Sequence, residues 1–278
     1  MSGSGSADAE TDPSPRRCVV LGGGGLSGIG WLRGVLDELP DVLHTADRVV
    51  GTSAGALLAA RLLGGGDADD LRLLVNELAG VRVSLAAASR LLAAQVAPSR
   101  RHALQWLGCR AVRPVALGEA AFVDLVGRAI GRTAWPASLI VVAVDGHSGR
   151  PAYFTRRSGV PLAPAVAASC AVPGVFPAVH IESRPYLDGG LRTPANADLA
   201  TGCDRTLVLA PQPRSVRSLR RPGHQAQRLR AGGAEVVLVQ DESFPAHSMA
   251  VNGLPAARER GRRAGRASAA EVRELWGW

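Results

Sequence analysis

The chain contains no lysine, so all 32 of its basic residues are arginine; with 24 acidic residues, the formal net charge is +8. Such a balance favours anionic partners, without distinguishing nucleic acid from acidic lipid headgroups. Aromatic residues are also scarce, at 4% of the chain. The arginine-rich stretches near the C-terminus lack the interleaved aromatics that a single-strand nucleic-acid groove uses. We therefore expect no nucleic-acid partner and interpret these stretches as solvated helix faces.

Long apolar runs are missing as well. No run approaches the roughly 18 residues that a membrane span needs, and the N-terminal stretch MSGSGSADAETDPSPRR has no apolar core of the kind found in signal peptides. Metal-binding cysteine pairs are absent too, because Cys18, Cys109, Cys170 and Cys203 are widely spaced. This spacing predicts neither a metal site nor a disulfide framework. Together these features predict a cytoplasmic protein, at most peripheral at the inner membrane face.

The remaining composition suits one globular unit. Residues 1–15 are rich in Ser, Gly, Asp and Pro and predict a disordered tail. No composition break divides residues 16–275, so we expect a single domain there. The segment from about 67 to 131 has mainly helical spacing. Short apolar runs alternate with helical patterns and predict buried strands at 18–21, 47–50, 138–145, 205–211 and 235–240. This alternation indicates an α/β fold with a mostly parallel, covered sheet.

One serine has a glycine two places away on each side, in Gly51-Thr52-Ser53-Ala54-Gly55. A predicted strand precedes it and a predicted helix follows. This is the context in which G-x-S-x-G forms a nucleophile elbow, with the serine Oγ presented above a sheet. The amide of Ala54 and the new helix N-terminus then lie near a developing oxyanion. The alternative is a chance match, because the chain has 33 glycines.

A glycine loop over Gly23–Gly28 follows the first strand and matches G-x-G-x-x-G. One interpretation is a dinucleotide fingerprint, with Asp47 downstream as the ribose contact. The other is an oxyanion hole, because consecutive glycines can turn several amides toward one point. The serine motif that comes next favours the oxyanion hole, since a dinucleotide-binding enzyme does not need a serine elbow there.

Three residues could activate Ser53. His224 and His247 come late enough for a Ser-His-Asp triad, but both lie in polar stretches that we interpret as surface loops. Asp188, in RPYLDGGLR, follows a short apolar approach and precedes two glycines. A carboxylate beside Oγ could accept its proton directly, if partial desolvation and a strong oxyanion hole offset its weak basicity. The alternative is an ordinary Asp-Gly turn.

The motifs GGGGLSG, GTSAG and DGG, in this order, resemble those of the patatin-like phospholipase family. The stretch ASCAVPGVFPAVHI before the aspartate is similar as well, and the resemblance covers roughly residues 17–270. It implies a three-layer α/β/α sandwich with a mostly parallel central sheet. It also implies hydrolysis of acyl esters in phospholipids or neutral lipids through an acyl-serine intermediate, without a metal or other cofactor.

Carried over to this sequence, the resemblance implies that Ser53 is the nucleophile and Asp188 the proton acceptor, in a dyad without histidine. The motif Asp188–Gly190 supplies the carboxylate. The donors of the oxyanion hole would be the amides of Gly23, Gly24 and Gly25; elbow geometry adds Ala54.

One position departs from the family pattern: Ser27 stands where members usually carry Arg or Lys before the last glycine of the loop. This leaves the headgroup preference open. A second open question is residues 81–101, an apolar helical stretch that ends in Arg100 and Arg101. It could be an interfacial lid on anionic lipid or an ordinary core helix.

The sequence is also compatible with two functions other than that of a serine lipid acyl hydrolase. The first is a non-catalytic lipid-binding or regulatory protein on the same fold. The second is a nucleotide-binding oxidoreductase, which the glycine loop and Asp47 would serve.

Overall fold

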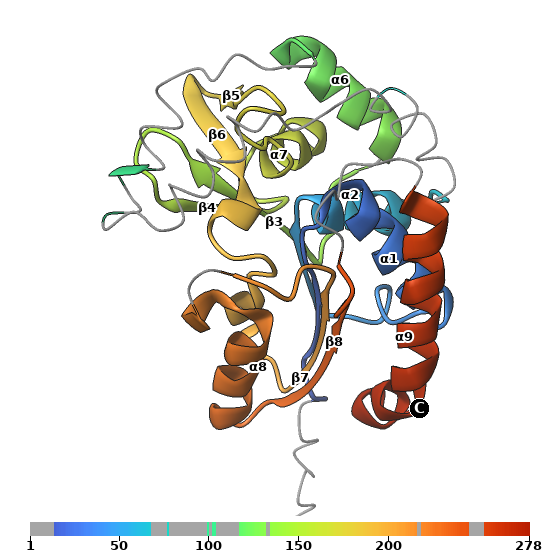
Figure 1. The fold of residues 1–278 in the computed structure, drawn as a ribbon. Helices are drawn as coiled ribbons and strands as arrows, with labels where there is room; N and C mark the ends of the chain where they lie inside the picture. Colours follow the sequence, from blue (N-terminus) through green and yellow to red (C-terminus); the bar gives the residue numbers. More distant parts are fainter. Residues whose placement is uncertain are drawn as a thin grey trace, which may run out of the picture.

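The computed structural model describes residues 14–67, 117–131, 134–215, 218–244 and 253–278, together with Glu77, Ser99, His102 and Ala103. Several expectations lie outside these residues: most of the tail at 1–15, most of the helical segment at 67–131, the lid or core helix at 81–101, and His247. The rest of the chain forms alternating strands and helices around one sheet (Figure 1).

Eight strands form the sheet. They are β1 (Arg17–Leu21), β2 (Arg48–Thr52), β3 (Leu139–Asp145), β4 (Pro151–Phe154), β5 (Val179–Ile181), β6 (Arg184–Asp188), β7 (Arg205–Ala210) and β8 (Glu235–Gln240). Six α-helices are described: α1 (Gly25–Asp37), α2 (Ala54–Leu63), α6 (Glu119–Ile130), α7 (Leu162–Ser169), α8 (Pro222–Ala231) and α9 (Leu254–Trp276). Short 3₁₀ turns are η2 (Gly189–Leu191), η3 (Ala197–Ala200) and η4 (Ser218–Arg220).

The sheet is mixed. Strands β3, β2, β1, β7 and β8 lie side by side in parallel, as the short apolar runs predict. Three antiparallel pairs extend it at the β3 end: β3 with β4, β3 with β6, and β5 with β6. The parallel strands read as continuous apolar runs because helices cover both of their faces.

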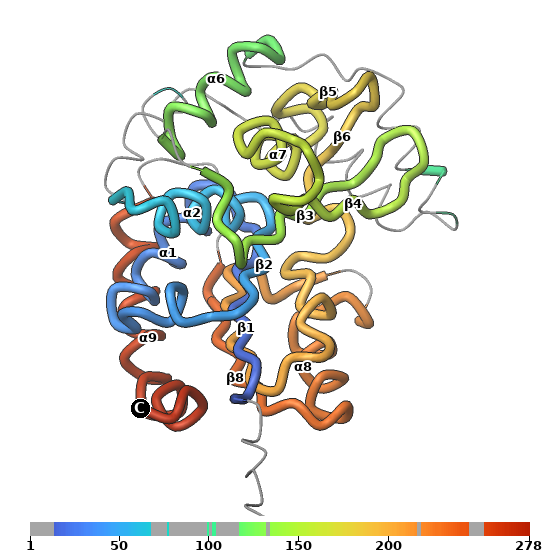
Figure 2. The backbone as a smooth tube through the Cα atoms, turned by 180° about the vertical axis from the view of Figure 1, so that it is seen from behind, coloured from blue at the N-terminus to red at the C-terminus, as the bar shows by residue number. Residues whose placement is uncertain are grey.

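Helices on both faces make the predicted three-layer α/β/α sandwich (Figures 1 and 2). Side chains of β1 alternate between the layers. Val19 and Leu21 belong to the larger core, which also holds residues of α1, α2, α6, α7 and α9. Cys18 and Val20 face the other way, into a smaller core that holds residues of η3 and α8. The family-implied architecture is therefore confirmed.

The helices α1 and α9 pack closely on one face of the sheet. A Cβ on Gly34 of α1 would overlap the carbonyl oxygen of Arg258, and a Cβ on Gly261 of α9 would overlap that of Trp31. Glycine at these positions lets the two backbones approach each other. Since α1 begins at the glycine loop, this packing anchors the loop to the C-terminal helix.

Two polar residues lie elsewhere than their sequence context indicates. His224 is in helix α8, not in a surface loop, and its Nδ1 atom is buried. The reason is that Pro222 opens the helix at its first turn, where a missing N–H costs nothing. Asp47 precedes β2, and its carboxylate accepts a 2.7 Å hydrogen bond from the Arg17 amide. It therefore lies at the end of the strands opposite the glycine loop and cannot serve a ribose held there.

Candidate active site

Ser53 sits in a sharp turn between β2, which ends at Thr52, and α2, which begins at Ala54. Its φ of 50° is positive, which is strained for a residue with a side chain. The flanking glycines make room for the turn. A Cβ on Gly51 would lie 2.6 Å from the Ala56 Cα, and one on Gly55 would overlap the carbonyl oxygen of Leu21. The strand–turn–helix geometry is that of a nucleophile elbow.

The sheet register brings Asp188 to this turn. On β3, Val142 pairs with Thr52 of β2, and the next residue, Ala143, pairs with Asp188 of β6. Strand β4 pairs with both Val142 and Ala143 and therefore occupies the other edge of β3. Strands β2 and β6 thus approach each other end to end along one edge of β3, and Ser53 follows directly at their junction.

The Ser53 Oγ donates a 2.7 Å hydrogen bond to Asp188 Oδ2. The other carboxylate oxygen, Oδ1, accepts a 2.6 Å hydrogen bond from the amide of Gly190. Both side chains are buried, with 8% of Ser53 and 5% of Asp188 exposed. Gly189, the residue after Asp188, has no room for a side chain, because a Cβ there would overlap the carbonyl oxygen of Val142. The serine hydroxyl and the carboxylate therefore form a buried, hydrogen-bonded pair.

Burial raises the pKa of Asp188 to about 6, even though the hydrogen bonds from Ser53 and Gly190 act to lower it. Removal from water disfavours the charged carboxylate, and this effect outweighs the two hydrogen bonds. A carboxylate with this pKa is a stronger base than an exposed aspartate. It is nevertheless mostly ionised at neutral pH, as a proton acceptor must be.

Two buried residues that the sequence analysis did not single out hold the turn. Ser169, the last residue of α7, accepts a 2.9 Å hydrogen bond from the Ser53 amide and donates a 2.5 Å one to the carbonyl of Val142. The Nδ2 of Asn196 donates to Thr52 Oγ1 at 3.0 Å and to the Gly189 carbonyl at 3.3 Å. Asn196 therefore ties the residue before the serine to the residue after the aspartate.

The glycine loop lies against the elbow. A Cβ on Gly23 would be 3.4 Å from the Ser53 Cβ. The Gly23 amide, however, donates a 2.8 Å hydrogen bond to the Pro194 carbonyl. Among the described residues, the amides of Gly24 and Gly25 have no acceptor. Of the three expected loop donors, these two are therefore the ones left to hold an oxyanion, while Gly23 provides space.

Three further sequence-selected residues have defined surroundings. Ser27, at the position where the family usually has a cation, is 1% exposed within α1. Ala54 begins α2, where the first amides have no acceptor inside the helix. No histidine of the described ranges hydrogen-bonds to Ser53 or Asp188, and His224 is in α8.

Cys170 is a neighbour that the sequence pattern does not reveal. Burial and the nearby charge of Asp188 raise the pKa of its thiol, although the Ser53 side chain acts to lower it. Within the described part of the chain, no three His, Cys, Asp or Glu side chains gather to hold a metal ion. None of the helices described there is both long and apolar enough to span a bilayer.

Comparisons with known proteins place the chain in a family. A model of the patatin-like phospholipase family matches residues 19–201, about two thirds of the 278 residues. Among solved structures, VipD from Legionella pneumophila is similar at 14% identity and a TM-score of 0.42, covering 92% of this chain and 67% of that one. The type III effector protein ExoU is similar at 18% identity and a TM-score of 0.38. In that case the match covers 92% of this chain and 54% of ExoU.

Comparison with curated proteins gave no match. The family match spans the glycine loop, the serine elbow and the aspartate turn, which are the three motifs that meet in the structure. The chain belongs to the patatin-like phospholipase family.

Proposed function

We propose that this protein is a serine lipid acyl hydrolase that cleaves acyl esters through an acyl-Ser53 intermediate, with Asp188 as the general base. The observation that carries the proposal is the 2.7 Å hydrogen bond from Ser53 Oγ to the buried carboxylate of Asp188. Membership of the patatin-like phospholipase family supports lipid esters as the substrate class. We further propose that residues 16–275 act as one hydrolase domain.

In the acylation step, Ser53 Oγ attacks the ester carbonyl carbon while its proton passes to Asp188 Oδ2. The carbonyl oxygen becomes an oxyanion, for which the amides of Gly24, Gly25 and Ala54 are the proposed donors. Such donors are worth about 3 kcal/mol each in related sites. The tetrahedral intermediate then collapses, the ester C–O bond breaks, and Asp188 returns the proton to the departing alcohol.

In the deacylation step, a water molecule attacks the acyl-Ser53 carbonyl and gives its proton to Asp188. The same amides hold the second oxyanion. Collapse releases the carboxylic acid and returns the proton to Ser53 Oγ, so the site ends as it began. No metal or cofactor enters either step, because the carboxylate and the main-chain donors supply both the base and the charge stabilisation.

The raised pKa of Asp188, about 6, fits this role. The strained φ of Ser53 fits it as well, since it holds Oγ away from the strand and toward the carboxylate. With a net charge of +8, the protein surface favours contact with anionic lipid headgroups. We propose a cytoplasmic protein that meets its substrate at the inner membrane face.

A fluorophosphonate probe tests the nucleophile. The purified protein should be labelled at Ser53, and Ser53→Ala should lose both the label and the hydrolysis of a phospholipid or a short-chain ester. Asp188→Asn should lose hydrolysis while keeping the native circular dichroism spectrum. Labelling at another serine, or hydrolysis by the Ser53→Ala variant, would contradict the proposal.

The histidines provide the matched control. His224→Ala and His247→Ala should each keep most of the activity, because the dyad has no place for an imidazole. Near-complete loss in either variant would instead favour a Ser-His-Asp triad. If liposomes bind the native protein but no ester is cleaved and no label appears, the non-catalytic lipid-binding alternative holds.

A further inference from the structure

Two cysteines far apart in the sequence meet at the end of the sheet opposite the glycine loop. Cys18 is near the start of β1, and Cys203 is in the turn between η3 and β7. Both are free thiols, and both belong to the smaller core. Their thiols are near enough for each to shift the pKa of the other. The proposed ester hydrolysis does not use this pair of thiols.

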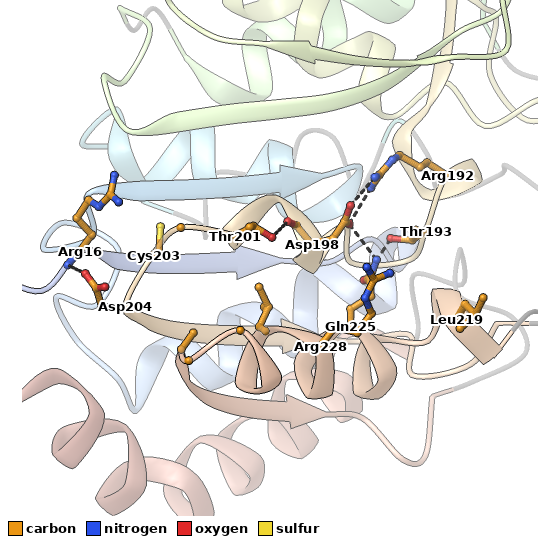
Figure 3. Close-up of a pocket in the computed structure, with 15 residues that line it drawn as sticks. Arg16, Arg192, Thr193, Asp198, Thr201, Cys203, Asp204, Leu219, Gln225 and Arg228 are labelled. Carbon is orange, nitrogen blue, oxygen red and sulfur yellow. Dashed lines mark hydrogen bonds and ion pairs between the residues drawn. The ribbon is translucent and has the colours of Figure 1, made fainter.

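Only one of the two thiols borders open space. Cys203 lines a cavity of about 720 Å³ that also touches Arg16, Asp204, Arg228 and Leu229, whereas Cys18 is not among its lining residues and is 0% exposed. Figure 3 shows Cys203 beside Arg16 and Asp204 at one end of this cavity. A small reagent in the cavity therefore meets Cys203 first, with Cys18 behind it.

Two arginines, Arg48 and Arg16, lie near Cys203. Arg48 donates hydrogen bonds from Nη1 to the carbonyls of Leu199, at 2.9 Å, and Thr201, at 3.1 Å, which fixes its guanidinium at the turn. The neighbouring Cys18 thiol and the charges of Arg48 and Arg16 lower the pKa of Cys203, although burial and Asp204 act to raise it. The pKa of Cys18 is raised by its interaction with the Cys203 thiol and by burial.

We propose that Cys203 and Cys18 form a peroxide-reactive pair, in which Cys203 reacts from the cavity and Cys18 resolves the product to an intramolecular disulfide. The Cys203 thiolate attacks one oxygen of hydrogen peroxide, the O–O bond breaks, and hydroxide leaves. This oxidises Cys203 to a sulfenic acid and reduces the peroxide. The Cys18 sulfur then attacks the Cys203 sulfur and displaces the hydroxyl group, which departs as water with the Cys18 proton.

Disulfide formation requires the two sulfurs to approach each other to about 2.0 Å. Thr201 and Gly202 are exposed, so the segment that carries Cys203 has one free side. The bond would join β1 to the turn before β7, strands that already pair in parallel. A thiol reductant should return both cysteines to the free state seen here.

The test treats the reduced, full-length protein with hydrogen peroxide, blocks the remaining thiols with iodoacetamide, and maps the peptides by mass spectrometry. We expect a Cys18–Cys203 linked peptide that has lost two hydrogen atoms and disappears on reduction. In Cys18→Ala, a sulfenic acid at Cys203 should be trapped by dimedone. In Cys203→Ser, hydrogen peroxide should leave Cys18 as an unoxidised thiol.

Cys170 is an internal control, because burial and Asp188 raise its pKa and leave it a poor nucleophile. At pH 7.5, iodoacetamide should label Cys203 at least about tenfold faster than Cys170. Faster labelling of Cys170, or a first disulfide that involves Cys170 or Cys109, would overturn the proposal. Because every readout is a mass, the result is independent of whether the protein hydrolyses esters. If Cys18→Ala does not fold, the wild-type map and Cys203→Ser decide the matter.

Discussion

The Oγ of Ser53 lies 2.7 Å from Oδ2 of Asp188, although 135 positions separate the two residues in the chain. Their meeting is a property of sheet register. Thr52 and Asp188 pair with consecutive residues of β3, from strands that arrive from opposite directions. A slip of β6 by one residue would turn the Asp188 side chain to the other face of the sheet, because side chains alternate along a strand.

The pH dependence of kcat/KM should report the ionisation of Asp188. Its pKa of about 6 predicts full activity above pH 7 and a tenfold fall per pH unit well below pH 6, as the base becomes protonated. The measurement uses a water-soluble short-chain ester between pH 4.5 and 9. His224→Ala should give the same profile. A wild-type midpoint near pH 4 would mean that the carboxyl ionises like an exposed aspartate, contrary to its burial.

Asp188 should also lower the stability of the folded protein once it is ionised. Its folded pKa of about 6 exceeds the ordinary 3.8, so stability is greatest below pH 3.8 and falls as pH rises through 6. The shift of about two pH units corresponds to a loss of about 3 kcal/mol. We expect the free energy of unfolding of the wild type, relative to Asp188→Asn, to decrease with pH in urea titrations between pH 4.5 and 8.

Asp145 serves as a control, because its ionisation should change the free energy of unfolding in the opposite direction. Although burial raises its pKa, hydrogen bonds from the amides of Ser148 and His147 and from Arg184 lower it overall. The wild type should therefore gain stability relative to Asp145→Asn as pH rises through the acid range. Equal slopes for the two variants would show that the Asp188 carboxylate is not destabilised by its surroundings.

Two glycines at the second position of a helix should respond oppositely to alanine. A Cβ at Gly55 in α2 would overlap the Leu21 carbonyl oxygen, so Gly55→Ala should cost at least about 2 kcal/mol and most of the activity. A Cβ at Gly223 in α8 would meet only Leu238 Cδ2, at 3.9 Å. Gly223→Ala should leave activity intact and add up to about 1 kcal/mol. Thermal unfolding compares the two, and a well-folded, active Gly55→Ala would contradict the packing described for the elbow.

A matched pair of threonines tests the polar support beneath Ser53. Both Thr52 and Thr206 are 0% exposed. Thr52 Oγ1 accepts a hydrogen bond from Asn196, whereas Thr206 Oγ1 has no partner among the described residues. Thr52→Val should lower the free energy of unfolding by about 1 kcal/mol or more and also lower kcat, since the residue before Ser53 loses its hydrogen bond from Asn196. Thr206→Val should be neutral or stabilising. Equal losses in denaturant titrations would mean that the Asn196 contact contributes nothing.

The sequence predicts the parallel half of the sheet well because its strands are short, continuous apolar runs. The antiparallel half is harder to predict. Strand β5 has only three residues, and the pairing of β6 with β3 joins segments more than 40 positions apart. The loop predicted around His224 is instead part of helix α8, whose apolar pattern is weak because Ala226 and Leu229 are the only apolar residues that it buries apart from Pro222.

The candidate site was predictable only in its chemistry. Local motifs indicate a serine turn, an aspartate turn and a glycine loop, and the structure brings all three together. The sequence does not predict which loop amides are free to hold an oxyanion, because the Gly23 amide donates to the carbonyl of Pro194, a residue distant in the chain. Ser169 lies in the family-like stretch ASCAVPGVFPAVHI, but nothing in the sequence indicates its role or that of Asn196, which only their contacts reveal.

The position of β1 has a practical consequence for dissecting the chain. The family match ends at residue 201, yet β1 pairs on one side with β7, and α1 packs against α9, both of which come later. A fragment cut after residue 201 would turn β1 into an outer strand with bare main-chain groups, a template for aggregation. Any hybrid or shortened protein built on this scaffold should therefore keep the chain as far as Trp276, where α9 ends.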